Sequence, residues 1–164
     1  MFRPLVLAVA LATVVAAHPA AVVAADASDP ERLLRGRYIA LLGGCNDCHT
    51  AGFAGLGGDL PESQWLKGDA VGYQGPWGTT YPPNLRAYFA ALDEDQWVAL
   101  APSFRARPPM PYWIINAMSE EDLRSLYEFV RSLGPPGEPA PAYAPPGQAV
   151  STPVVVFPAP PPES

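Results

Sequence analysis

Cysteine and histidine are scarce in this chain, which has two of each among its 164 residues. Cys45 and Cys48 are three positions apart, so a disulfide between them would close a very small loop and constrain little of the unfolded chain. A disulfide framework like those of small exported folds is therefore excluded. A zinc site needs about four ligands, and carboxylates aside, the chain beyond residue 25 offers only these two cysteines and His49.

Internal repeats are missing too, and no apolar run after residue 25 reaches the about 20 residues that span a bilayer. Before that point, a basic residue precedes an apolar stretch that ends at small residues, Ala25 and Ala27, which is typical of a secretory signal peptide. The alternative is an uncleaved anchor, because residues 4–25 are uncharged. His18-Pro19 interrupts that run and favours cleavage at Ala25 or Ala27. We therefore expect residues 1–25 to be a signal peptide.

Positive charge is also in short supply. The formal net charge is -6, and removal of residues 1–25 leaves nine basic against sixteen acidic residues, a charge of -7. An acidic exported protein is a poor binder of nucleic acid, so no nucleic-acid partner is expected. The charge favours a partner with a positive docking patch and an encounter that weakens with salt. An acidic surface that merely keeps the protein in solution explains the charge equally well.

The first segment with helical spacing covers residues 30–42. Asp29 is a suitable cap and Pro30 fits the first helical position. Leu34, Tyr38 and Leu41 follow at helical spacing, and a pair of glycines ends the segment just before Cys45.

Two further helices are expected at residues 93–100 and 119–133. In the first of these, Trp97 and Leu100 are expected to point inward. The second has Ser119 as its cap and acidic residues in its first turn. Its expected core face comprises Leu123, Leu126, Tyr127, Val130 and Leu133.

In the remaining segments, apolar residues do not recur at a regular spacing. Residues 50–85 are rich in Gly and Pro, and we expect loops there with at most a short turn of helix. Beyond residue 134 the composition changes, since 11 of the 22 prolines follow it. Such a segment cannot form a packed domain of its own and is expected to be extended or polyproline-like. The sequence leaves open whether residues 154–157 form a short strand against the domain or belong to a flexible tail.

The sequence Cys45-Asn46-Asp47-Cys48-His49 has the C-x-x-C-H pattern of a c-type haem attachment site. The two thiols form thioethers with the two haem vinyl groups, and the adjacent histidine places an imidazole nitrogen on the iron. A dithiol exchange site is the rival, but such motifs precede a helix in a βαβ context, and the strand pattern is missing here. We expect one haem c, covalently bound through Cys45 and Cys48, with His49 as a metal ligand.

The second axial ligand follows by elimination. Without residues 1–25, His49 is the sole histidine, which excludes bis-histidine ligation within the chain. Met118 directly precedes the Ser119 cap, where an apolar residue packs on the helix. Met110 lies among three prolines, in a stiff segment that suits a weak Fe–S bond because the ligand is preorganised. We therefore expect Met110 to bind the iron; an open or water-bound sixth position is the alternative.

Other residues are expected to support the haem. His49 should donate its second ring nitrogen to a backbone carbonyl, and Pro76 is the candidate acceptor. One or two of the tryptophan indole N–H groups, and Asn84, are candidates for hydrogen bonds to the haem propionates.

These motifs together resemble a class I cytochrome c. The resemblance is carried by Gly36-Arg37-Tyr38-Ile39-Ala40, Cys48-His49-Thr50, Gly78-Thr79-Thr80-Tyr81-Pro82-Pro83-Asn84-Leu85 and Met110-Pro111-Tyr112. More narrowly, the chain is similar to the haem modules in cytochrome subunits of bacterial alcohol and aldehyde dehydrogenases. The resemblance implies a small all-α fold wrapped around one covalent haem, with Met110 as axial ligand.

The expected organisation is a signal peptide at 1–25, a cytochrome c domain at 26–133 and a Pro-rich extension at 134–164. The expected function is periplasmic one-electron transfer by a protein that is not itself an enzyme. The resemblance implies a dehydrogenase or other respiratory donor, a downstream acceptor such as a terminal oxidase, and peripheral membrane association through such a complex. The alternative function is a haem-based sensor, or a haem protein that reacts with small molecules at an open sixth site.

Overall fold

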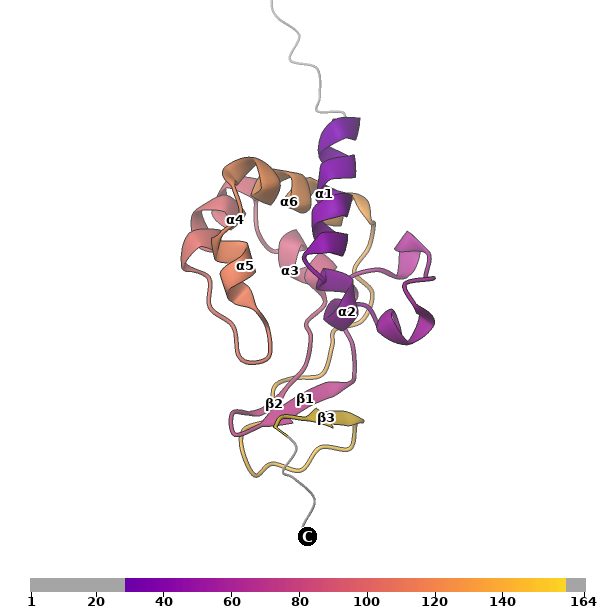
Figure 1. The fold of residues 1–164 in the computed structure, drawn as a ribbon, viewed down its shortest axis with the longest axis vertical. Coiled ribbons are helices and arrows are strands. Elements are labelled where there is room, and N and C mark those ends of the chain that lie inside the picture. The colour runs from indigo at the N-terminus through magenta and orange to yellow at the C-terminus, as the bar shows by residue number, and fades with distance from the viewer. Residues whose placement is uncertain (1–28, 159–164) are drawn as a thin grey trace, which may run out of the picture.

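The computed structural model describes residues 29–158 (Figure 1). Its helices are α1 (Pro30–Leu42), α2 (Cys45–His49), α3 (Leu85–Ala90), α4 (Glu94–Leu100), α5 (Tyr112–Asn116) and α6 (Glu120–Ser132). Its strands are β1 (Gly72–Gly75), β2 (Gly78–Thr80) and β3 (Val154–Val156). The signal peptide expected at 1–25 lies outside the described residues. Between residues 29 and 158, no helix is long and apolar enough to cross a membrane.

The three helices that the sequence predicts are confirmed, together with their caps. Asp29 Oδ1 accepts a hydrogen bond from Glu31 N at 3.0 Å at the start of α1. At α4, Asp93 and Gln96 form a reciprocal capping box. At α6, Ser119 Oγ accepts from the backbone N–H of the third helical residue at 3.1 Å. Each cap satisfies a backbone N–H that has no partner within its helix.

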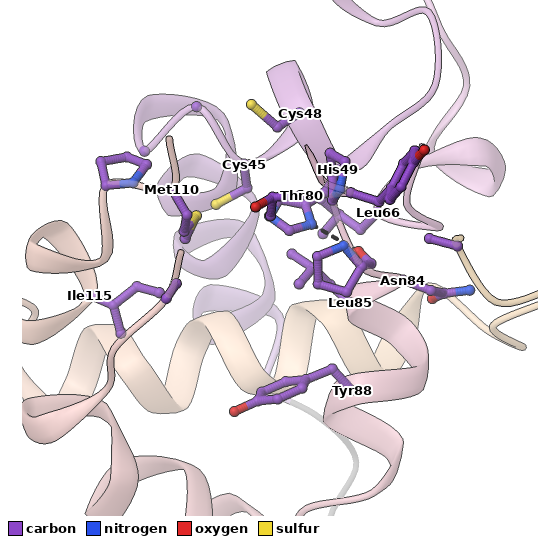
Figure 2. A pocket seen from close by; sticks show the side chains of 18 of the residues that line it. Cys45, Cys48, His49, Leu66, Thr80, Asn84, Leu85, Tyr88, Met110 and Ile115 are labelled. Atoms are coloured by element: carbon purple, nitrogen blue, oxygen red, sulfur yellow. Dashed lines mark hydrogen bonds between the residues drawn. The ribbon is translucent and has the colours of Figure 1, made fainter. Parts of the chain in front are cut away.

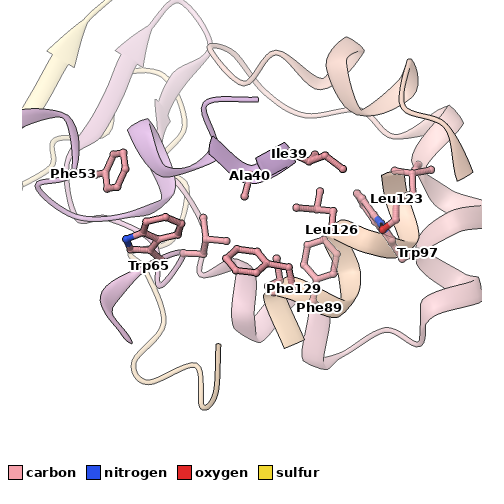
Figure 3. Packing of buried hydrophobic residues seen from close by; sticks show 12 residues of the cluster. Ile39, Ala40, Phe53, Trp65, Phe89, Trp97, Leu123, Leu126 and Phe129 are labelled. Carbon is pink, nitrogen blue, oxygen red and sulfur yellow. The ribbon is translucent and has the colours of Figure 1, made fainter. Parts of the chain in front are cut away.

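Helices α1 and α6 pack closely and form the centre of the hydrophobic core (Figure 3). Their contact requires a glycine at position 36, because a Cβ there would lie 2.0 Å from Ser125 O. The buried face of α1 consists of Gly36, Ile39 and Ala40. The helical spacing of Leu34, Tyr38 and Leu41 predicts the helix correctly, but these side chains lie on its exposed face.

The predicted core faces of α4 and α6 are confirmed in part. Trp97 is buried, as expected, whereas the inward orientation expected of Leu100 is wrong, since 37% of its surface is exposed. On α6, all five residues of the expected face lie in or pack against the core, and the sequence prediction missed Phe129, which is also buried.

The all-α fold class expected from the resemblance is wrong, because the structure also contains a three-stranded mixed sheet in the order β2-β1-β3. β1 and β2 form an antiparallel hairpin, with Tyr73 opposite Thr80. β3 pairs with β1 in parallel, with Tyr73 opposite Val155. The strands are only three or four residues long, β1 and β2 contain glycine and β3 is three valines, so no alternation of apolar and polar residues marks them in the sequence.

The Pro-rich segment is extended and packs on the rest of the molecule. In Figure 1 it runs from the end of α6 to the sheet, where it supplies β3. On the way, Thr79 and Ala144 exchange two backbone hydrogen bonds, of 2.8 and 3.0 Å. Of the two alternatives for residues 154–157, the short strand is therefore correct.

Candidate haem site

A cavity of about 810 Å³ lies between α2, the segment that leads from β2 into α3, the segment before α5, helix α6 and the Pro-rich segment. Its volume is within the about 300–1,000 Å³ that is usual for ligand and cofactor sites. Most of the residues that line it are apolar or aromatic, among them Leu66, Tyr81, Leu85, Phe89, Trp97, Ile115, Leu126 and Val130. Figure 2 shows this cavity with the side chains of the sequence motif at its wall.

The C-x-x-C-H motif forms the one-turn helix α2, and Cys45, Cys48 and His49 all line the cavity. In a helix, residues three and four positions apart lie on the same face. Cys45 therefore shares a face with Cys48 and with His49, and all three residues contribute to the cavity wall. Both cysteines are free rather than joined in a disulfide.

The imidazole of His49 has a fixed orientation. It is 5% exposed, and its Nδ1 lies 2.8 Å from the backbone carbonyl oxygen of Pro83. A carbonyl only accepts hydrogen bonds, so Nδ1 carries the proton and the lone pair is on Nε2. The carbonyl acceptor is thus Pro83, and the expectation of Pro76 is wrong. Burial lowers the pKa of His49 despite this hydrogen bond, which keeps the ring in the neutral form that binds metal ions.

The two thiols differ in their surroundings. Burial raises the pKa of the Cys45 thiol to about 11, so the sulfur stays protonated at neutral pH. The hydroxyl of Tyr73 donates to Cys48 Sγ at 3.5 Å, and burial followed by this bond raises the pKa of Tyr73. A protonated, buried thiol is poorly suited to thiol–disulfide exchange.

The zinc alternative has no support in the structure. Among residues 29–158, no three or more His, Cys, Asp or Glu side chains are grouped so that they could hold a metal ion. Zinc in proteins almost always has four such ligands in its structural sites. Within residues 29–158, the motif therefore has no grouped ligands of the kind that a structural zinc site uses.

Both candidate methionines, Met110 and Met118, line the cavity. Met110 lies in a tight turn, where its N–H donates to Arg107 O at 3.2 Å and its carbonyl accepts from Tyr112 N at 2.9 Å. Figure 2 shows its side chain at the cavity wall together with those of Cys45 and His49. Met118 packs against the hydrophobic core, as expected from its place before the α6 cap. Met110 thus stays the predicted axial ligand.

The structure changes the choice of propionate donors. The indole N–H groups of Trp65, Trp77 and Trp97 donate to backbone carbonyls. The side-chain amide of Asn84 also donates to two backbone carbonyls. The sequence analysis missed Thr80, which lines the cavity and whose buried Oγ1 has no hydrogen-bond partner. A buried hydroxyl without a partner at a cavity wall is suited to a polar group on a ligand.

Comparisons with protein-family models, curated proteins and solved structures gave no match to this chain. The interpretation of the site therefore depends on its motif and on the geometry described above.

Proposed function

We propose that the protein binds one haem c through Cys45 and Cys48, with His49 and Met110 as axial ligands, and transfers single electrons. One observation carries the proposal. The two free thiols and the oriented imidazole of one C-x-x-C-H motif line a largely apolar cavity of about 810 Å³ that also includes Met110. The residues present fit a haem, because they supply both thioether sulfurs, a neutral imidazole and a thioether side chain.

A bound haem c supplies reversible one-electron chemistry, and the chain's residues determine its setting. Cys45 and Cys48 attach it covalently, so it is kept when water enters the cavity. Pro83 O orients the His49 ring and fixes its tautomer. A methionine ligand raises the reduction potential relative to a second imidazole. The apolar lining also influences the reduction potential, because it buries the haem. Thr80 is the proposed hydrogen-bond donor to a propionate.

The proposed setting is the periplasm, after export through residues 1–25. The resemblance to cytochrome subunits of dehydrogenases supports a respiratory donor of that kind and an acceptor such as a terminal oxidase. Membrane association would then be peripheral, through the complex. The role is that of an electron carrier rather than an enzyme, since it requires no proton-transfer residue.

The proposal is tested by the optical spectra of the wild-type holoprotein and of Met110→Ala and Met118→Ala. Ferric haem with a methionine ligand has a weak absorption band at about 700 nm, which is characteristic of the proposed ligation. We expect Met110→Ala to lose the band and Met118→Ala, the matched control, to keep it, because only Met110 binds the iron.

Two results would contradict the proposal. A protein that binds no covalent haem when made with a cytochrome maturation system would overturn it as a whole. A wild-type protein that lacks the band and binds carbon monoxide freely in the reduced state would overturn the carrier function and favour an open-site sensor or small-molecule-reacting protein.

A further inference from the structure

Residues 134–158, here called the C-terminal strap, close one side of the cavity. Four of these residues line it, namely Pro139, Ala140, Pro141 and Tyr143. The strap is separate from the C-x-x-C-H helix and from the turn that carries Met110. Because it lines the cavity, it limits how solvent and small ligands would reach the iron of the proposed haem.

The strap is attached at both ends. Near its start, Asn84 Nδ2 donates to Pro136 O at 2.7 Å and to Glu138 O at 3.1 Å. Near its end, β3 pairs with β1, and the N–H of Phe157 donates to Gln74 O at 2.7 Å. These attachments fix the strap over the cavity although it has no helix.

Tyr143 joins the strap to the segment that carries Met110. Its hydroxyl donates to Trp77 O at 2.8 Å in the β1–β2 hairpin. The guanidinium carbon of Arg107 lies 3.8 Å from the centre of its ring, the shortest such distance among the described residues. The carbonyl of Arg107 in turn accepts the N–H of Met110. The contacts therefore run without interruption from the hairpin through Tyr143 to the proposed axial ligand.

We propose that Tyr143 and Arg107 are positioning residues for Met110, and that the strap thereby restricts exchange of the sixth ligand. This inference rests on the proposed haem site. A weak Fe–S bond competes with external ligands only when the methionine is preorganised. The cation–π contact supplies part of that preorganisation.

The test is a titration of the ferric holoprotein with imidazole. Binding is monitored through the loss of the absorption band at about 700 nm. We expect Tyr143→Ala to bind imidazole about threefold more tightly, the change that loss of an exposed cation–π contact produces. Tyr143→Phe keeps the ring against Arg107 but loses the hydrogen bond to Trp77 O, so its imidazole affinity should lie between those of the wild type and Tyr143→Ala. Tyr38→Ala is the matched control: Tyr38 also lies beneath an arginine, at 5.9 Å, but outside the cavity lining.

A second variant distinguishes loss of this contact from a general loss of stability. Arg107→Ala should also raise the imidazole affinity, and the double variant should show no further increase over Tyr143→Ala, because both substitutions remove the cation–π contact.

The inference is overturned if Tyr143→Ala matches the Tyr38→Ala control, or if the two substitutions act additively. Failure of the proposed function differs from this: the wild-type protein would then lack covalent haem or the methionine band before any variant is made, which would overturn both proposals.

Discussion

Gly36 shows how one residue determines the packing of two helices. A Cβ at this position would lie 2.0 Å from Ser125 O and 2.6 Å from Phe129 Cβ. Both neighbours belong to α6, so neither can move without shifting the helix. Close packing of α1 on α6 therefore depends on the missing side chain.

We expect Gly36→Ala to lower the free energy of unfolding by about 1–3 kcal/mol, the usual cost of overpacking a core. Urea denaturation of the holoprotein measures this change. Gly55→Ala is the matched control, because a Cβ there has no neighbour within 4 Å and its φ is not positive. Equal stability of the two variants would contradict the close approach of α1 and α6.

At the scale of residues, the sequence predicts those parts of the site whose residues are close together in the chain. The C-x-x-C-H pattern of Cys45, Cys48 and His49 is evident in the sequence because the three residues are near neighbours in the chain. The partner of His49 was assigned to the wrong proline, because Pro83 is 34 positions away and reaches the imidazole only through the fold. The sequence also contains no indication of Thr80, because a single threonine at the end of a short strand has no signal of its own.

At the scale of elements, the helices α1, α4 and α6 are predictable from their caps, whereas the sheet is not predictable from the sequence. A cap is a contact between residues two or three positions apart, so the sequence contains all of it. The pairing of β1 with β3 joins Gly72 to Val154, and strands this short have no period to detect. The exposed apolar residues of α1 also explain why its buried face was not evident.

Asn84 makes hydrogen bonds to both α3 and the strap. A substitution at this position can therefore remove one set of bonds and keep the other. Asn84 Oδ1 accepts from Ala87 N at 3.0 Å and caps α3, while its Nδ2 donates to the strap. We expect Asn84→Asp to keep the helix cap and lose both strap bonds, at a cost of about 1–3 kcal/mol. Hydrogen–deuterium exchange should then be faster in residues 136–144 and unchanged in α3.

Asn116→Asp is the control for this experiment. Its Nδ2 also donates to two backbone carbonyls, but these belong to Ala101 and Phe104 rather than to the strap. Exchange in residues 136–144 should stay at the wild-type rate in this variant. Faster exchange there in both variants would show that the strap responds to general loss of stability rather than to Asn84.

At the scale of the whole molecule, charge is the property with a measurable consequence. The proposed mature chain has a formal charge of -7. Part of the acidic surface is paired: Arg124 lies 2.9 Å from both Asp95 and Glu120, and Arg32 lies 2.7 Å from Glu94. The acidic excess remains after such pairing and favours encounters with positively charged proteins.

We expect the rate of electron exchange with a small basic redox protein to fall by about tenfold between roughly 0.01 and 0.5 M salt, because salt screens the attraction. Exchange with a small acidic redox protein should become faster over the same range, because salt then screens repulsion. Stopped-flow absorbance at the haem bands measures both rates. The same salt dependence with both partners would contradict a role of net charge in the encounter.

The position of the strap along the chain also sets the order in which the site is assembled. A chain grows and folds from its N-terminus, and residues 134–158 follow all the other residues that line the cavity. The C-x-x-C-H motif is thus synthesised before the strap that forms one wall of its cavity. If the proposed haem is attached before the strap packs, it would reach Cys45 and Cys48 by the side that the strap covers in the folded protein.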